Sequence, residues 1–182
     1  MKKYYLVILI IFSISEASAI TKNNIIQNLK NIKNYTFNFE QNINGKIENG
    51  ICTIQYDKKI FCEYNLTNQK ILVSNGKSLV IKTVNSYYLY PIEKTPLNFI
   101  LNKKFLLNKI NDLEERIIDK KFINYRFIEN ENEINIFFDK KNFNLVGWQT
   151  LDIYQNLSIT FLSSIIKNQK LKKNLFHLPK QN

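Results

Sequence analysis

The chain has 182 residues, with 26 lysines and arginines against 15 acidic residues, which gives a formal net charge of +11. One histidine and two cysteines exclude the His/Cys clusters that hold zinc, and two thiols are too few for a disulfide-rich scaffold. The lysines are scattered rather than gathered in one segment, which argues against a nucleic-acid-binding surface.

The start of the chain has the order of a secretory signal peptide. Two lysines follow the first Met, an uncharged apolar run covers 4–13, and small residues at Ala17 and Ala19 mark an expected cleavage site. The run is shorter than the about 20 residues that a membrane span needs, so cleavage after Ala19 is favoured over an uncleaved anchor. We therefore predict a signal peptide over 1–19 and a single mature domain over 20–182.

Export also affects how the charge is interpreted. The signal peptide contains Lys2, Lys3 and Glu16, so its removal lowers the net charge to +10. Export takes the chain away from nucleic acid, and none is expected as a partner. The remaining lysines fit a solvated basic surface, the simpler interpretation, or a weak attraction to acidic partners and anionic lipid headgroups.

The first part of the mature chain predicts one helix followed by a strand meander. Residues 21–33 place apolar side chains at helical spacing, and Thr21 can cap their start. From Tyr35 the period changes to two, which predicts a strand over 35–41 with one apolar face. Asn-Gly and other polar turns then separate further expected strands over 46–56, 60–64, 71–73, 78–83 and 87–90.

The pattern changes at Thr95-Pro96, which opens a helical segment over 97–118. Thr95 is the expected cap, and proline suits the first turn of a helix. A break near 102–104 favours two short helices over one long helix. Strands resume near Phe122, and the later segments expected as strands include 134–138, 145–151, 157–162 and 169–171.

Seven short motifs follow one another along the chain. They are Tyr35–Gln41, with the pattern aromatic-x-x-x-Phe-x-Gln, then Gly50, Val73–Lys77, Thr95–Leu97, Leu145–Trp148, Asp152 and Leu175–Pro179. In this order, behind a signal peptide, they resemble the periplasmic outer-membrane lipoprotein carrier family, LolA. The resemblance covers nearly the whole mature chain. It implies a periplasmic protein that is mainly β with α: an unclosed antiparallel β-barrel, or curled sheet, with helices covering its concave face.

Three positions depart from the family pattern. Tyr56-Asp57 stand where the family usually has Arg-Pro, Cys62 stands for a large aromatic, and Gln155 stands for a turn glycine. The family's arginine is understood to hold the helical lid closed. The hydroxyl of Tyr56 carries no fixed charge, so the departure predicts a weaker latch.

The resemblance further implies an apolar pocket between the strands and the helices. From periodicity alone, a dry core is the simpler interpretation of the same side chains, and only the resemblance favours a pocket. A pocket would shelter acyl chains, since a chain of roughly 16 carbons loses on the order of 12 kcal/mol in water. The residues expected to line the pocket are Phe37, Phe39, Cys52, Ile54, Tyr56, Ile60, Cys62, Tyr64, Leu97, Ile100, Leu101, Phe105 and Leu106.

The two cysteines have two possible states. By strand alternation Cys52 and Cys62 both face inward across one hairpin, in a compartment that permits a disulfide. A disulfide would close a short loop, but bridging needs Cα atoms within about 7 Å, and the sequence does not fix the register. Two free, inward thiols are slightly favoured.

The function implied by the resemblance is a carrier of acylated lipoproteins. It would take them as a monomer from an inner-membrane ABC exporter to an outer-membrane acceptor, with no cofactor, metal or catalysis. One alternative is an envelope lipid-binding sensor or regulatory module of the same fold. Another is a secreted hydrolase, but His177 has no Gly-x-Ser-x-Gly elbow to accompany it, and Asp112, Glu114 and Glu115 fit a solvated helix face.

Overall fold

The structure is a computed structural model that describes residues 21–66, 68–152 and 155–181. The predicted signal peptide over 1–19 lies outside these residues. Residues 21–31 are helical and are called the N-terminal helix here, which confirms the predicted helix with an end two residues earlier than expected.

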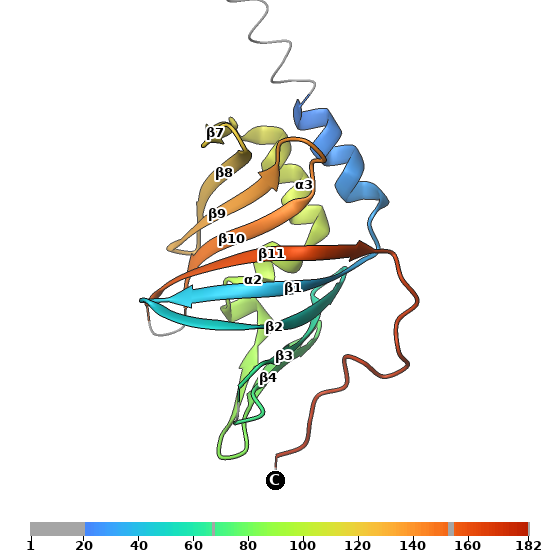
Figure 1. The fold of residues 1–182 in the computed structure, drawn as a ribbon, viewed down its shortest axis with the longest axis vertical. Helices are drawn as coiled ribbons and strands as arrows, with labels where there is room; N and C mark the ends of the chain where they lie inside the picture. Colours follow the sequence, from blue (N-terminus) through green and yellow to red (C-terminus); the bar gives the residue numbers. More distant parts are fainter. Residues whose placement is uncertain (1–20, 67, 153–154, 182) are drawn as a thin grey trace, which may run out of the picture.

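The strands form one eleven-stranded antiparallel sheet (Figure 1). Its spatial order is β6-β5-β4-β3-β2-β1-β11-β10-β9-β8-β7, and the two outer strands do not pair, so the sheet is not closed. This confirms the predicted fold class. The strands are β1 (Asn34–Ile43), β2 (Lys46–Gln55), β3 (Lys59–Tyr64), β4 (Ile71–Asn75), β5 (Ser78–Lys82), β6 (Tyr87–Pro91), β7 (Arg116–Ile118), β8 (Phe122–Glu129), β9 (Asn132–Asp139), β10 (Leu145–Leu151) and β11 (Leu157–Lys167).

The strands of the first meander, β1 to β6, lie within two residues of their predicted bounds. Asn44 and Gly45 both have positive φ in the β1–β2 turn, as the Asn-Gly signal indicates. The two ends of the chain meet where β1 pairs with β11. This pairing joins the first meander to the second, which contains β7 to β11.

Two short helices follow β6 and a 3-10 turn (Ile92–Lys94): α2 (Leu97–Leu101) and α3 (Lys103–Asp112). The predicted break is confirmed, and Asn102 makes it by accepting a hydrogen bond from the Phe105 N–H at 3.1 Å. The predicted cap at Thr95 is wrong: Pro96 is the N-cap of α2, and the Thr95 hydroxyl donates to the Ile92 carbonyl at 2.8 Å.

The prediction of helix as far as residue 118 is also wrong, because residues 116–118 form strand β7. Asp119 and Lys120 both have positive φ, which turns the chain back so that β7 pairs with β8. The Arg116 Nε donates to Asn124 Oδ1 at 3.1 Å across this hairpin. Tertiary pairing therefore overrides the local helical pattern.

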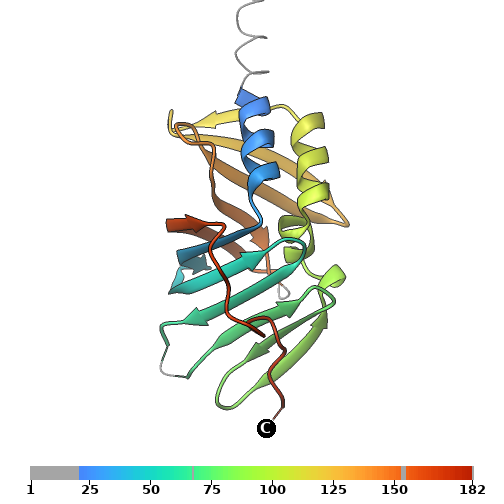
Figure 2. The same ribbon diagram turned by 90° about the vertical axis from the view of Figure 1, so that its right-hand side faces the viewer.

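The predicted strand over 169–171 is wrong as well. Strand β11 continues to Lys167, and Asn168 then takes a positive φ of 54°. The Gln169 N–H donates to the Asn34 side chain at 3.1 Å instead of to a neighbouring strand. The tail that follows runs past the strands of the first meander (Figure 2), where Lys82 Nζ donates to the Lys180 carbonyl at 2.8 Å.

One half of the sheet is filled by packed side chains. This packed half consists of β8, β9 and β10 with the N-terminal helix and α3, which lie side by side in Figure 2 and are joined by a 3.1 Å hydrogen bond from Lys22 Nζ to the Asn111 carbonyl. Alternate side chains of the strands point at the two helices. Those with at most 1% of their surface exposed are Ile25, Leu29, Ile110, Tyr125, Ile134, Ile136, Phe138 and Leu145.

Candidate functional site

The other half of the sheet encloses a cavity of about 390 Å³. Strands β1 to β6 provide most of its wall, the ends of β10 and β11 provide one side, and the start of α2 borders it. We call this region the hollow half. The volume lies within the about 300–1,000 Å³ that is usual for small-molecule sites. The exposed Tyr88 and Lys46 border the cavity, so it reaches the surface.

The inner part of the wall is apolar. The ring of Phe39 meets the ring of Tyr64 edge to face at a centroid distance of 4.9 Å. Gly50 makes room for this pair, because a Cβ there would come within 2.9 Å of Phe39 Cε1 and 2.0 Å of the Glu63 carbonyl. The apolar lining residues are Phe39, Cys52, Ile60, Cys62, Leu72, Leu79, Ile81, Tyr90, Leu97 and Trp148.

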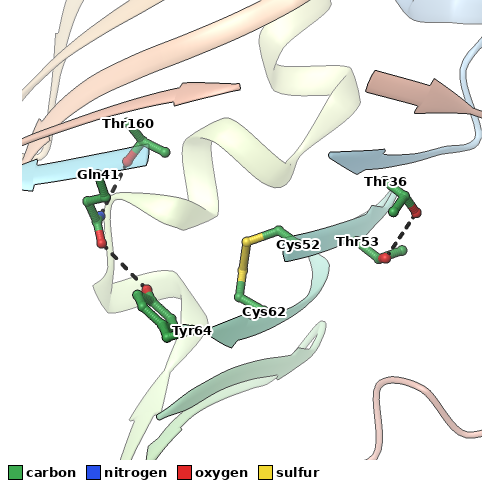
Figure 3. Close-up of a disulfide and its surroundings, with 7 residues drawn as sticks. All are labelled: Thr36, Gln41, Cys52, Thr53, Cys62, Tyr64 and Thr160. Carbon is green, nitrogen blue, oxygen red and sulfur yellow. Dashed lines mark hydrogen bonds between the residues drawn. A yellow bond between two sulfur atoms is a disulfide. The ribbon is translucent and has the colours of Figure 1, made fainter. Parts of the chain in front are cut away.

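Cys52 and Cys62 form a disulfide on this wall (Figure 3). The expectation of two free thiols is therefore wrong. The strand register explains the bond: the two cysteines are direct partners in the β2–β3 pairing, with their Cα atoms 4.1 Å apart. That distance lies well inside the about 7 Å limit for bridging. Both residues are almost fully buried, and both line the cavity.

A band of polar side chains crosses the wall toward the outer ends of the strands. Gln41 Nε2 donates to Ser158 Oγ at 2.9 Å and to Thr160 Oγ1 at 3.3 Å, and the Tyr64 hydroxyl donates to Gln41 Oε1 at 3.5 Å. Figure 3 shows Gln41 between Thr160 and Tyr64. Thr150 also lines the cavity and is the strand partner of Ser158. We call these five residues the polar row.

Beyond the polar row, a buried carboxylate lies between two lysines. Glu48 is 3% exposed, and its two oxygens pair with Lys46 Nζ at 2.8 Å and Lys70 Nζ at 2.5 Å. The Lys70 ammonium also lies 4.1 Å from the centre of the Tyr64 ring. Burial alone raises the pKa of Glu48, but hydrogen bonds from both lysines hold it below its ordinary value. We call these three charged residues the charged rim.

The cavity has a gradient of polarity along its strands. The disulfide and Trp148 lie at the apolar part, the polar row follows, and the charged rim comes last. Because period-two alternation places residues i and i+2 on one face, the change occurs within single strands, as from Phe39 to Gln41 and from Cys52 to Glu48. Such a wall can hold an elongated ligand with an apolar tail and a polar end.

The thirteen residues predicted to line a pocket all belong to one apolar cluster or pack against it. The structure divides them between the cavity wall and the core, and their contact with lipid stays a prediction. Those on the cavity wall are Phe39, Cys52, Ile60, Cys62, Tyr64 and Leu97. Those that pack in the cluster away from the wall are Phe37, Ile54, Tyr56, Ile100, Leu101, Phe105 and Leu106.

Sequence reasoning missed most of the polar lining residues. Gln41 was available, since it alternates with Phe39, but the search favoured apolar side chains. Ser158 and Thr160 come close to Gln41 only through the pairing of β1 with β11, which lies more than a hundred residues away in sequence. Trp148 and Leu79 were equally hidden by unknown strand order.

The β2–β3 turn holds the junction between α2 and α3. The Lys58 N–H donates to the Leu101 carbonyl at 2.9 Å, at the end of α2, and Asp57 Oδ1 accepts from the Lys103 N–H at 3.1 Å, at the start of α3. Within the described residues the buried Tyr56 hydroxyl has no hydrogen-bond partner. Contacts made by the neighbours of Tyr56 therefore attach the helices to the sheet.

Two further searches covered the described part of the chain. No group of three or more His, Cys, Asp or Glu side chains there could hold a metal ion. No helix in the same residues is long and apolar enough to cross a membrane.

The family model of the outer membrane lipoprotein carrier protein LolA matches residues 22–179. The chain therefore belongs to this family, as the motif order predicts. The match spans both halves of the sheet and the helices. No curated protein sequence matches the chain.

Solved structures show the same fold at low identity. MucB is 8% identical with a TM-score of 0.51, and the match covers 90% of this chain and 63% of MucB. The LolA superfamily protein NE2245 from Nitrosomonas europaea is 9% identical with a TM-score of 0.43, covering 87% and 98% of the two chains. PNGF-II is 14% identical with a TM-score of 0.37, and the match covers 79% of this chain and only 29% of PNGF-II.

Proposed function

We propose that this member of the outer membrane lipoprotein carrier family shields the acyl chains of lipoproteins in the cavity of the hollow half. The observation that carries the proposal is a cavity of about 390 Å³ whose inner wall is apolar and which reaches the surface. An acyl chain placed against Trp148 and the Cys52–Cys62 disulfide would leave water, at a gain of about 0.8 kcal/mol per buried CH₂.

The proposed role includes transfer in the periplasm. The carrier would receive lipoproteins from an inner-membrane ABC exporter and deliver them to an outer-membrane acceptor, acting as a monomer without catalysis or cofactor. The expected signal peptide over 1–19 and the family membership support this location. The attachment of α2 and α3 to the turn at Asp57 and Lys58 supports a lid whose release would open the cavity.

The test is native mass spectrometry of the mature protein after co-expression with a triacylated lipoprotein. We expect a one-to-one complex for the native chain. Ile81→Glu places a charge on the cavity wall and should abolish the complex, because the carboxylate loses hydration when an acyl chain covers it. Ile128→Glu is the matched control, since Ile128 is 66% exposed, and it should leave the complex intact.

The result that contradicts the proposal is equally clear. If the native chain emerges without lipoprotein, and a fluorescent fatty acid also finds no saturable site, the hollow half is not an acyl-chain site. Equal binding by Ile81→Glu and the native chain would place the ligand elsewhere.

A further inference from the structure

We infer that the polar row is an acyl-carbonyl site: it takes the carbonyl oxygen of an ester- or amide-linked acyl chain and so fixes the direction in which a ligand enters. The inference rests on the proposed function and names the ligand group that the cavity recognises. It adds a polar determinant to a pocket that otherwise sorts ligands only by apolar area.

The first argument is the placement of the hydroxyls. Ser158, Thr160 and Thr150 come from two adjacent strands, and Gln41 comes from the next one, through the pairs Gln41–Thr160 and Thr150–Ser158. All three hydroxyl-bearing residues are buried, with 4%, 3% and 8% of their surfaces exposed, yet all line the cavity. Buried hydroxyls that face a cavity need partners from inside it, because no strand or helix covers them.

The second argument is the hydrogen-bond inventory. Gln41 Nε2 donates to both Ser158 and Thr160, which leaves each hydroxyl with its own O–H to donate. Within the part of the chain that the structure describes, neither O–H has an acceptor. The Tyr64 hydroxyl donates to Gln41 Oε1, which holds the amide in the orientation that presents its N–H groups to the hydroxyls. The row therefore offers donors, and a carbonyl oxygen is the acceptor that an acyl ligand carries.

The third argument is the surroundings of the row. On one side lie Trp148 and the disulfide, where an acyl tail fits, and on the other lies the charged rim with Lys46, Glu48 and Lys70. A carbonyl marks the same boundary in an ester- or amide-linked lipid, between the apolar chain and the polar remainder. The alignment places the tail toward the disulfide and the head toward the rim.

The experiment compares two ligands that differ only in the carbonyl: a monoacylglycerol and the alkyl glyceryl ether of the same chain length. Dissociation constants are measured with the mature protein by displacement of a fluorescent fatty acid. We expect the native chain to prefer the ester about threefold to tenfold, the range that one or two net hydrogen bonds give. The double variant Ser158→Ala/Thr160→Val should bind both ligands equally.

Thr53→Val is the control for the loss of a threonine hydroxyl. Thr53 lies on the opposite face of the sheet, where its hydroxyl pairs with that of Thr36 at 3.0 Å, away from the polar row in Figure 3. It should keep the ester preference of the native chain. Circular dichroism of each variant checks the fold, and Ser158→Ala alone, which should retain part of the preference, replaces the double variant if that one does not fold.

The outcomes separate the two proposals. Equal binding of ester and ether by the native chain, or an unchanged preference in the hydroxyl variants, overturns the acyl-carbonyl site and leaves the carrier function standing. Failure of both ligands to bind overturns the carrier function and the site together.

Discussion

The packed half and the hollow half are built on the same alternating strand pattern but are filled differently. In the packed half, inward side chains such as Phe138 and Ile136 meet the N-terminal helix and α3 and are fully buried. In the hollow half, only the start of α2 reaches the strands, and about 390 Å³ remains unfilled. The comparison teaches that helix coverage, rather than strand sequence, decides whether an inward apolar face becomes core or cavity.

The lengths of the helices account for the difference. At 1.5 Å per residue, the ten residues of α3 extend about 15 Å and the five of α2 only about 7 Å. The helix α2 ends at Leu101, where the turn at Lys58 receives it. The wall formed by β3 to β6 therefore has no helix across most of its inner face (Figure 2).

The largest expected effect compares one phenylalanine from each half. Phe138→Ala should lower the free energy of unfolding by about 3–5 kcal/mol, because it creates a void in a close-packed region. Phe39→Ala should cost less, since Phe39 already borders empty space, but it should weaken acyl-chain binding. Urea denaturation and fatty-acid titration of both variants check this. Equal stability losses, with binding unaffected by either change, would remove the distinction between the halves.

The disulfide is the next largest effect. Cys52→Ala/Cys62→Ala should lower the free energy of unfolding by about 2–3 kcal/mol, because the bond closes a short loop that is otherwise free in the unfolded chain. Urea denaturation of the oxidised native chain and the double variant measures it. A bound acyl chain should also slow reduction of the native disulfide, which lies on the cavity wall. A reduction rate that ignores ligand would argue that the chain binds away from the hollow half.

The charged rim predicts a pH dependence that the packed half does not share. Glu48 has a folded pKa below its ordinary value of 4.5, so its contribution to stability is present above that value and is lost as the pH falls through the folded pKa. Glu48→Gln should lower stability near neutral pH and flatten its fall in acid, by less than the loss of the disulfide. Unfolding at a series of pH values measures this. A slope identical to that of the native chain would show that Glu48 has no such role.

The smallest expected effect concerns the attachment of the helices. Asp57→Asn removes a negative charge from the start of α3 and should cost about 0.3–1 kcal/mol. Hydrogen exchange should rise in α3 and leave the sheet unaffected. Asp119→Asn, in the exposed β7–β8 turn, is the matched control. Faster exchange throughout the sheet in Asp57→Asn would mean that the turn stabilises the whole fold rather than the helices.

The sequence predicts the parts of this molecule that depend on local pattern. The period of two and the Asn44-Gly45 turn place β1 and β2 correctly, and the motif order identifies the family. Strand β7 and the disordered order of the last segment depend on partners far along the chain, and both were predicted wrongly. The hairpin at Asp119 and the side chain of Asn34 decide those segments, and neither is visible in local periodicity.

The candidate site shows the same limit. Alternation correctly places Cys52 and Cys62 on one inner face, but the register that makes them direct partners follows from the three-residue turn between β2 and β3. The distinction between core and cavity was not available either, because it depends on where α2 ends. Leu97 borders the cavity, whereas Leu101, one helical turn later, is in the core.

The most direct test of the account uses the single tryptophan of the chain. Trp148 is 5% exposed and lines the cavity, so its emission reports on whatever fills the hollow half. The account predicts that a fatty acid brominated on its chain quenches this emission with a saturable, one-to-one dependence, and that Ile81→Glu abolishes the effect. Fatty acid that binds without quenching Trp148, or quenching that never saturates, would contradict the claim that the hollow half holds acyl chains.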